Sequence, residues 1–119
     1  MLDDILDIGN SIIDGQGYDV SMLAPTIVDF WCQEHHKGSG HERHVHPSWA
    51  LLSGFYFLDC PENSSRVLIH DPRPAKEYGV YLPEKDVNNG TLASNILNFT
   101  PVPGRFMITN SWLPHAFTR

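Results

Sequence analysis

Prolines set the strongest limit on what this chain can fold into. Between residues 61 and 114 seven of them, at positions 61, 72, 74, 83, 101, 103 and 114, separate short runs rich in β-branched and aromatic residues. Proline cannot donate a hydrogen bond to a neighbouring strand, so it marks strand ends, corners and edges. The runs that we expect to form strands are 26–33, 50–59, 65–71, 79–82, 95–100 and 105–110. This spacing predicts a mainly β, mostly antiparallel domain of the sandwich or small-barrel kind.

The N-terminal segment has a different character. Leu2, Ile5, Leu6, Ile12 and Ile13 recur at helical spacing, with the aspartates mostly on the opposite side, and Gly15 follows as a C-cap. We therefore expect an amphipathic helix over about 2–14 and a β core over about 26–117. A chain of 119 residues with 41% hydrophobic composition fits one compact domain, 1–119.

Charge and composition argue against several classes of protein. The net charge is −6, and no Lys or Arg precedes Lys37, so a nucleic-acid backbone would be repelled from the N-terminal end. No apolar run is long enough to span a bilayer, and the first residues lack the basic region of a signal peptide. Cys32 and Cys60 form no C-x-x-C motif. We expect a soluble, cytoplasmic protein that binds neither nucleic acid nor membrane.

Histidines are concentrated in the segment GHERHVHPSW, residues 40–49. If the HVH segment is a strand, His44 and His46 project from the same face, as two ligands of one metal ion would. The candidate third ligand is His115 in SWLPHAF, because a strand and a proline turn precede it and could return it to the first pair. Imidazole is a good ligand for Fe, Zn, Cu and Ni.

The remaining histidines are weaker candidates. His41 is not aligned with the pair on a strand face and is expected at the rim. His35 and His36 are expected in a solvated turn, with contact to the substrate as the alternative, and His70 is expected at the surface, with a place in the pocket as the alternative. The segment HERH is not the zinc-protease motif H-E-x-x-H, because its histidines are three residues apart. No G-x-S-x-G motif supports a serine hydrolase.

Several motifs together resemble a known family. The segments HVHPSWALLSGFYFLDCPE, VLIHDPRP and PVPGRFMITNSWLPHAF resemble, in the expected order, the 2-oxoglutarate and Fe(II)-dependent oxygenases, specifically a small group from bacteria and phages. The pattern of that group is H-x-H-P, L-S-G-x-Y, D-P-R and W-L-x-H. The resemblance covers about residues 31–117 and implies a double-stranded β-helix, a cupin-like jelly roll with the iron at its mouth.

The resemblance also implies roles for individual residues. His44 takes the position of the first histidine of the family's H-x-D/E motif, His46 that of the acidic residue and His115 that of the distal histidine. Tyr56 lies in the strand whose tyrosine can touch the cosubstrate in related enzymes. The implied chemistry uses Fe(II), 2-oxoglutarate and O2 to hydroxylate a C–H bond of a small-molecule or peptide substrate.

Two features depart from the family pattern. His46 replaces a carboxylate, which raises the charge of a metal site by one unit. The family usually places a basic residue about ten residues beyond the distal histidine, where it pairs with the far carboxylate of the cosubstrate, whereas this sequence continues for four residues beyond His115. Either the last strand is missing from this chain or another cation holds that carboxylate. Arg73, Arg105 and Arg119 are candidates for that role, since a guanidinium binds both oxygens of a carboxylate. Their alternative roles are a stabilised turn in DPRP for Arg73, a strand-surface position for Arg105, which we favour, and a frayed terminus for Arg119.

The sequence is also compatible with other functions. GSGHERHVH fits the start of the cupin signature, although the glutamate that should follow is absent. Three histidines with Zn²⁺ and a bound water would instead favour hydrolysis. A third alternative is a non-catalytic jelly-roll binding module. Because edge strands often pair between subunits, a homodimer is also an expectation.

Overall fold

The computed structural model describes residues 2–78, 82–87 and 89–119, and they form two compact units, Met1–Gln33 and Glu34–Arg119. The first unit contains one helix, α1 (Leu2–Gly15), in agreement with the expected 2–14. Asp3 and Asp4 lie in its first turn, where negative charge is favourable to the helix dipole. No helix among the described residues has the length and apolar character needed to cross a membrane. Whether the chain forms one domain stays a prediction.

The expected strand over 26–33 is wrong. These residues form neither helix nor strand, and all of their side chains are exposed, among them Phe30 at 79% and Trp31 at 58%. β-branched and aromatic residues favour a strand because they pack on a half-buried pleated surface, and this segment has no such surface. The predicted β core over 26–117 therefore begins at residue 41 in the structure.

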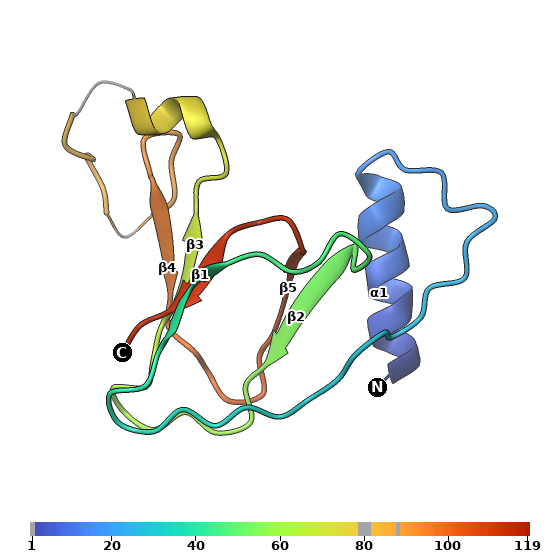
Figure 1. Ribbon diagram of the computed structural model, residues 1–119, viewed down its shortest axis with the longest axis horizontal. Coiled ribbons are helices and arrows are strands. Elements are labelled where there is room, and N and C mark those ends of the chain that lie inside the picture. Colours follow the sequence, from blue (N-terminus) through green and yellow to red (C-terminus); the bar gives the residue numbers. More distant parts are fainter. Residues whose placement is uncertain (1, 79–81, 88) are drawn as a thin grey trace. The chain divides into compact units, whose positions relative to one another are not determined.

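The described residues of the second unit form two antiparallel sheets (Figure 1). One sheet has four strands in the order β1 (His41–His44), β6 (His115–Phe117), β3 (Val67–His70) and β4 (Ile96–Phe99). The other pairs β2 (Leu52–Tyr56) with β5 (Phe106–Asn110). A 3₁₀ helix, η1 (Pro74–Tyr78), follows β3. The prediction of a mainly β, antiparallel protein with an N-terminal helix is thus confirmed, and the two sheets are consistent with a jelly roll.

The observed strands agree in part with those expected from the sequence. Four of the expected runs contain the centres of β2, β3, β4 and β5, while the expected run 79–82 lies largely outside the described residues. The three-residue strand β6 was not expected, because it follows Pro114 directly and is too short to show alternation. Backbone pairing with β1 and β3 on both sides holds it in place.

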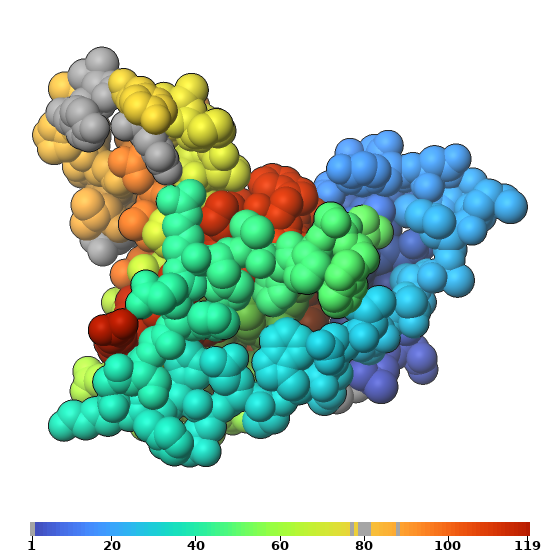
Figure 2. Space-filling model, in the orientation of Figure 1, coloured from blue at the N-terminus to red at the C-terminus, as the bar shows by residue number. Residues whose placement is uncertain are grey.

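Four buried residues of the second unit lie on β3 and β6, which are the two inner strands of the four-stranded sheet. Val67 is 0% exposed, Ile69 6%, Ala116 7% and His115 0%. Figure 2 shows the red C-terminal residues only partly visible behind the teal-to-green segment 35–50. The core of the sheet therefore includes an ionisable side chain, His115.

A truncation in this core should destabilise the protein. Replacing Val67 by Ala leaves a cavity beside β6 and should lower the free energy of unfolding by roughly 1–3 kcal/mol, measured by urea unfolding. The matched control is Leu92→Ala, because Leu92 is 84% exposed and its loss should change stability by less than about 0.5 kcal/mol. Equal effects of the two substitutions would contradict the assignment of β3 to the core.

Candidate metal centre

Two of the three candidate ligands are brought together by strand pairing. In the antiparallel pair β1–β6, His44 lies directly opposite His115, although the two residues are 71 positions apart in the chain. Directly opposite residues of an antiparallel pair project from the same face. The register of this pair is shifted by a bulge between His41 and His44, and bulges re-aim side chains at sheet edges.

His46 lies beside the other two histidines, but strand alternation with His44 is not what positions it. β1 ends at His44, so His46 does not share a strand with it, and strand alternation does not explain their common direction. Instead the backbone N–H of His46 donates to the carbonyl oxygen of Ser111 at 2.9 Å. This bond holds the turn after β1 against the end of β5.

The three imidazoles converge on one point. His44, His46 and His115 each offer one nitrogen, and these nitrogens lie within 4.8 Å of one another. Nε2 of His46 is 3.2 Å from Nε2 of His115. The ring centroids of His44 and His115 are 4.3 Å apart, and those of His46 and His115 are 5.0 Å apart. Such spacing allows one ion to contact all three rings.

Backbone carbonyls determine which nitrogen of two rings faces that point. Nδ1 of His44 lies 2.8 Å from the carbonyl oxygen of Glu42, and Nδ1 of His115 lies 2.9 Å from that of Leu113. A carbonyl oxygen only accepts, so in the neutral rings the proton is on Nδ1 and the lone pair is on Nε2. A hydrogen bond of this kind orients the ring and fixes the tautomer of histidines that bind metals.

Burial keeps the inner rings neutral. It is the main cause that lowers the pKa of His115, with a smaller contribution from repulsion by the neighbouring histidines, and the bond to Leu113 acts in the opposite direction. The pKa of His46 is lowered by burial and by repulsion from His44 and His41. Near neutral pH these two rings therefore offer lone pairs to a cation.

Aromatic rings close one side of the site. The ring of Phe55 on β2 meets that of His115 edge to face at a centroid distance of 5.3 Å, and it meets Phe117 at 5.2 Å. The ring of His41 stacks on that of His44 at 4.0 Å and is exposed, which agrees with the expected rim position. His70 is not part of the cluster, which contains only His44, His46 and His115 among the residues that the structure describes.

The residues expected to hold the cosubstrate do not gather at the histidines. Tyr56 follows Phe55 in β2, so strand alternation places it on the opposite face of the sheet, where it is 51% exposed. The guanidinium of Arg73 binds Asp71, with Nε at 2.9 Å from Oδ1 and Nη2 at 2.6 Å from Oδ2. The backbone N–H of Arg73 also donates to Asp71 Oδ1 at 2.9 Å, as a stabilised DPRP turn requires.

The other two arginines are at the surface. Arg119 donates from Nη2 to Glu42 Oε1 at 3.0 Å, and both side chains are more than 70% exposed. Such an exposed pair exchanges easily with another carboxylate, because exposed ion pairs are worth only about 0–1 kcal/mol. Arg105 is exposed at the turn before β5, as the surface interpretation expects.

Two hydroxyl groups near the site were not found from the sequence. Thr109 lies two residues after Met107, which pairs with Phe55, so Thr109 and Phe55 project from the same face of their sheet. Its Oγ1 is buried without a hydrogen-bond partner among the described residues. Oγ of Ser111 is also buried without a hydrogen-bond partner among the described residues. Ser111 is 2% exposed, and its carbonyl oxygen accepts the hydrogen bond from the backbone N–H of His46. Alternation along 107–111 is the signal that could have identified them.

The chain was compared with known proteins. A family model described as "Putative 2OG-Fe(II) oxygenase" matches residues 29–119. Neither a curated protein nor a solved structure gave a significant match.

The geometry predicts metal binding that depends on all three rings. Co²⁺, a spectroscopic probe, should give visible absorption in the wild-type protein and raise its Tm, because a ligand that binds only the folded state stabilises it. Loss of a partner that merely orients a ligand costs about 10- to 100-fold in affinity, so His44→Ala and His46→Ala should each weaken binding by at least that factor. His36→Ala is the matched control, because the side chain of His36 is 77% exposed. A Tm shift retained in all three variants would rule out this centre.

Proposed function

Because the chain belongs to the 2OG-Fe(II) oxygenase family, we propose that His44, His46 and His115 bind Fe(II) and that the protein oxygenates a C–H bond of a small molecule. The observation that carries this proposal is the convergence of three imidazole nitrogens within 4.8 Å. When bound, Fe(II) and 2-oxoglutarate would activate O2, of which one oxygen atom oxidises the cosubstrate to succinate and CO2 and the other enters the C–H bond of the substrate. The protein residues bind the metal ion, orient the cosubstrate and the substrate, and exclude water.

The donor set suits a dianionic cosubstrate. Three neutral imidazoles leave the ion with its full double charge, whereas a site with one carboxylate would reduce it by one unit. Burial of His115 at 0% exposure and the ring of Phe55 keep water away from one side of the ion. Electrostatic attraction is stronger where water is excluded, so a carboxylate ligand binds more tightly there.

Two buried hydroxyl groups are candidate hydrogen-bond donors for the cosubstrate. Thr109 and Ser111 each bury a hydroxyl oxygen without a partner among the described residues. An unsatisfied buried polar group costs about 1–3 kcal/mol, and an oxygen atom of a bound carboxylate would remove that cost. Arg119 stays a candidate for the far carboxylate, because its pair with Glu42 is exposed. Arg73 and Tyr56 are weaker candidates on geometric grounds.

A hydrolytic zinc site is the second candidate function. Three histidines with an open fourth position are also the donor set of zinc enzymes that activate water. The two functions differ in their need for a cosubstrate. Only the oxygenase forms a complex whose spectrum depends on 2-oxoglutarate.

The oxygenase function predicts a spectral signature. Anaerobic titration with Fe(II) and 2-oxoglutarate should produce a visible charge-transfer band only when both are present. His46→Ala should lose the band, whereas His46→Asp should retain it because it restores the carboxylate of the wider family at this position. Stoichiometric zinc in protein purified without added metal, with no band after exchange for Fe(II), would favour the hydrolytic site instead.

The hydroxyl groups of Thr109 and Ser111 should increase the affinity for 2-oxoglutarate. Thr109→Val combined with Ser111→Ala should raise the Kd for 2-oxoglutarate by roughly 5- to 30-fold, because each lost hydrogen bond is worth about 1 kcal/mol. Unfolding stability should not fall, since both unpartnered polar atoms are removed. Thr100→Val, at an exposed position, serves as the control. If the double variant binds 2-oxoglutarate as tightly as the wild type, these hydroxyls bind structural water only.

A further inference from the structure

A cleft of about 440 Å³ is lined by the end of β3, the turn after it, the loop before β4 and β4 itself. Ile69 on β3 lies opposite Leu97 on β4 and opposite His115 on β6, so these three side chains form a row across the sheet. Ile69 and Leu97 line the cleft, as does Leu113, whose carbonyl orients the ring of His115. Ile69 is therefore the cross-strand neighbour both of Leu97 in the cleft and of His115 in the histidine cluster.

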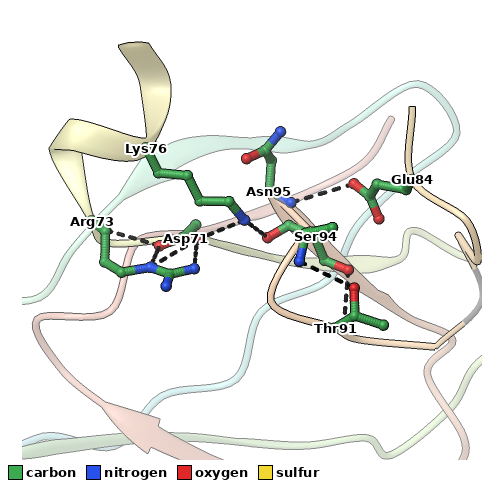
Figure 3. A network of polar contacts seen from close by, with 8 residues as sticks. Asp71, Arg73, Lys76, Glu84, Thr91, Ser94 and Asn95 are labelled. Atoms are coloured by element: carbon green, nitrogen blue, oxygen red, sulfur yellow. Dashed lines mark hydrogen bonds and ion pairs between the residues drawn. The ribbon is translucent and has the colours of Figure 1, made fainter. Parts of the chain in front are cut away.

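A polar network fixes the walls of the cleft (Figure 3). Lys76 donates from Nζ to Asp71 at 3.1 Å and to the carbonyl oxygen of Ser94 at 2.5 Å. The backbone N–H of Thr91 donates to Ser94 Oγ at 3.0 Å, and that of Asp71 donates to the carbonyl of Asn95 at 2.8 Å. These bonds tie the turn after β3 to the loop before β4, so the cleft is formed before any ligand arrives.

The lining of the cleft combines apolar side chains with one cation. Ile69, Leu97 and Leu113 are apolar, and Arg73 is the one cationic residue among those that line the cleft. Its side chain is 55% exposed, and it faces Asp71 with only the edge formed by Nε and Nη2. A guanidinium has five N–H donors in a planar fork, so its other edge can bind a second carboxylate.

The charges around Arg73 favour an anion over a cation. Asp71 carries one negative charge and contacts two cations, Arg73 and Lys76, so these three side chains together carry a net charge of +1. Hydrogen bonds from Arg73 hold the pKa of Asp71 well below its usual range, so this carboxylate stays ionised. Glu84 lies across the loop, where its Oε1 accepts from the backbone N–H of Asn95 at 3.4 Å. An ammonium group would find no unshared carboxylate among the residues that line the cleft.

We propose that this cleft binds the substrate and that the substrate is a small carboxylic acid with an apolar carbon chain. Its carboxylate binds Arg73, and its chain lies over Ile69 and Leu97 and presents a carbon atom toward His115. The volume is within the range of about 300–1,000 Å³ that is usual for small-molecule sites. The identification of the ligand as a substrate rests on the proposed oxygenase function, whereas the binding site itself does not.

The test uses metal-free protein and three probes of equal chain length: hexanoate, hexanol and hexylammonium. Isothermal titration should show that hexanoate binds about tenfold more tightly than hexanol, because a charge-assisted pair is roughly twice as strong as a neutral one. Hexylammonium should bind more weakly than both. Arg73→Gln should reduce the preference for hexanoate over hexanol to less than about twofold, and Arg73→Lys should retain part of it. Leu97→Asn should weaken the binding of both uncharged and anionic probes.

Arg66→Gln is the matched control, because Arg66 is exposed just before the opposite end of β3 and does not line the cleft. Thermal unfolding of each variant shows that it is folded before binding is measured. Equal affinity of the wild type for hexanoate and hexanol, or an unchanged preference in Arg73→Gln, would overturn the proposal. The titrations contain neither metal nor cosubstrate. A negative result in the Fe(II) titration would therefore not contradict carboxylate binding in the cleft, and a negative result in the cleft would not contradict the oxygenase function.

Discussion

The antiparallel pairing of β1 with β6 is the contact on which the candidate site depends. It places His44 opposite His115 and joins two parts of the sequence that lie 71 residues apart. β6 also pairs with β3, where Ile69 lies opposite His115, so the same short strand connects the histidine cluster with the buried core. A change in the register of β6 by one residue would turn His115 to the other face of the sheet, away from both His44 and Ile69.

The electrostatics of the site follow from this position. A histidine on an inner strand is desolvated, which lowers the pKa of His115 and keeps its ring neutral. The carbonyls of Glu42 and Leu113 then hold the protons of two rings on the side away from the centre. Because Nε2 of His115 carries the lone pair, the 3.2 Å contact with Nε2 of His46 is a hydrogen bond in which His46 donates. A cation at this point would replace that proton and accept a lone pair from each ring.

Sequence reasoning identified the three histidines, the N-terminal helix and four of the strands, because each has a local pattern of its own. It placed His44 and His46 together for the wrong reason, since β1 ends at His44 and a long-range bond to Ser111 positions His46. The segment 26–33 has strand-forming residues but no partner strand, and partners are not encoded locally. The roles of Thr109 and Ser111 were also invisible, because an unpartnered hydroxyl is defined by its surroundings in three dimensions.

The central claim is that three imidazoles hold one Fe(II) ion. X-ray absorption at the iron edge, on the anaerobic Fe(II) protein, tests it most directly, because imidazole rings produce a characteristic multiple-scattering pattern. The account predicts three imidazole ligands in the wild type and two in His46→Ala. A spectrum that shows only oxygen ligands, or one that is the same in both proteins, would contradict it.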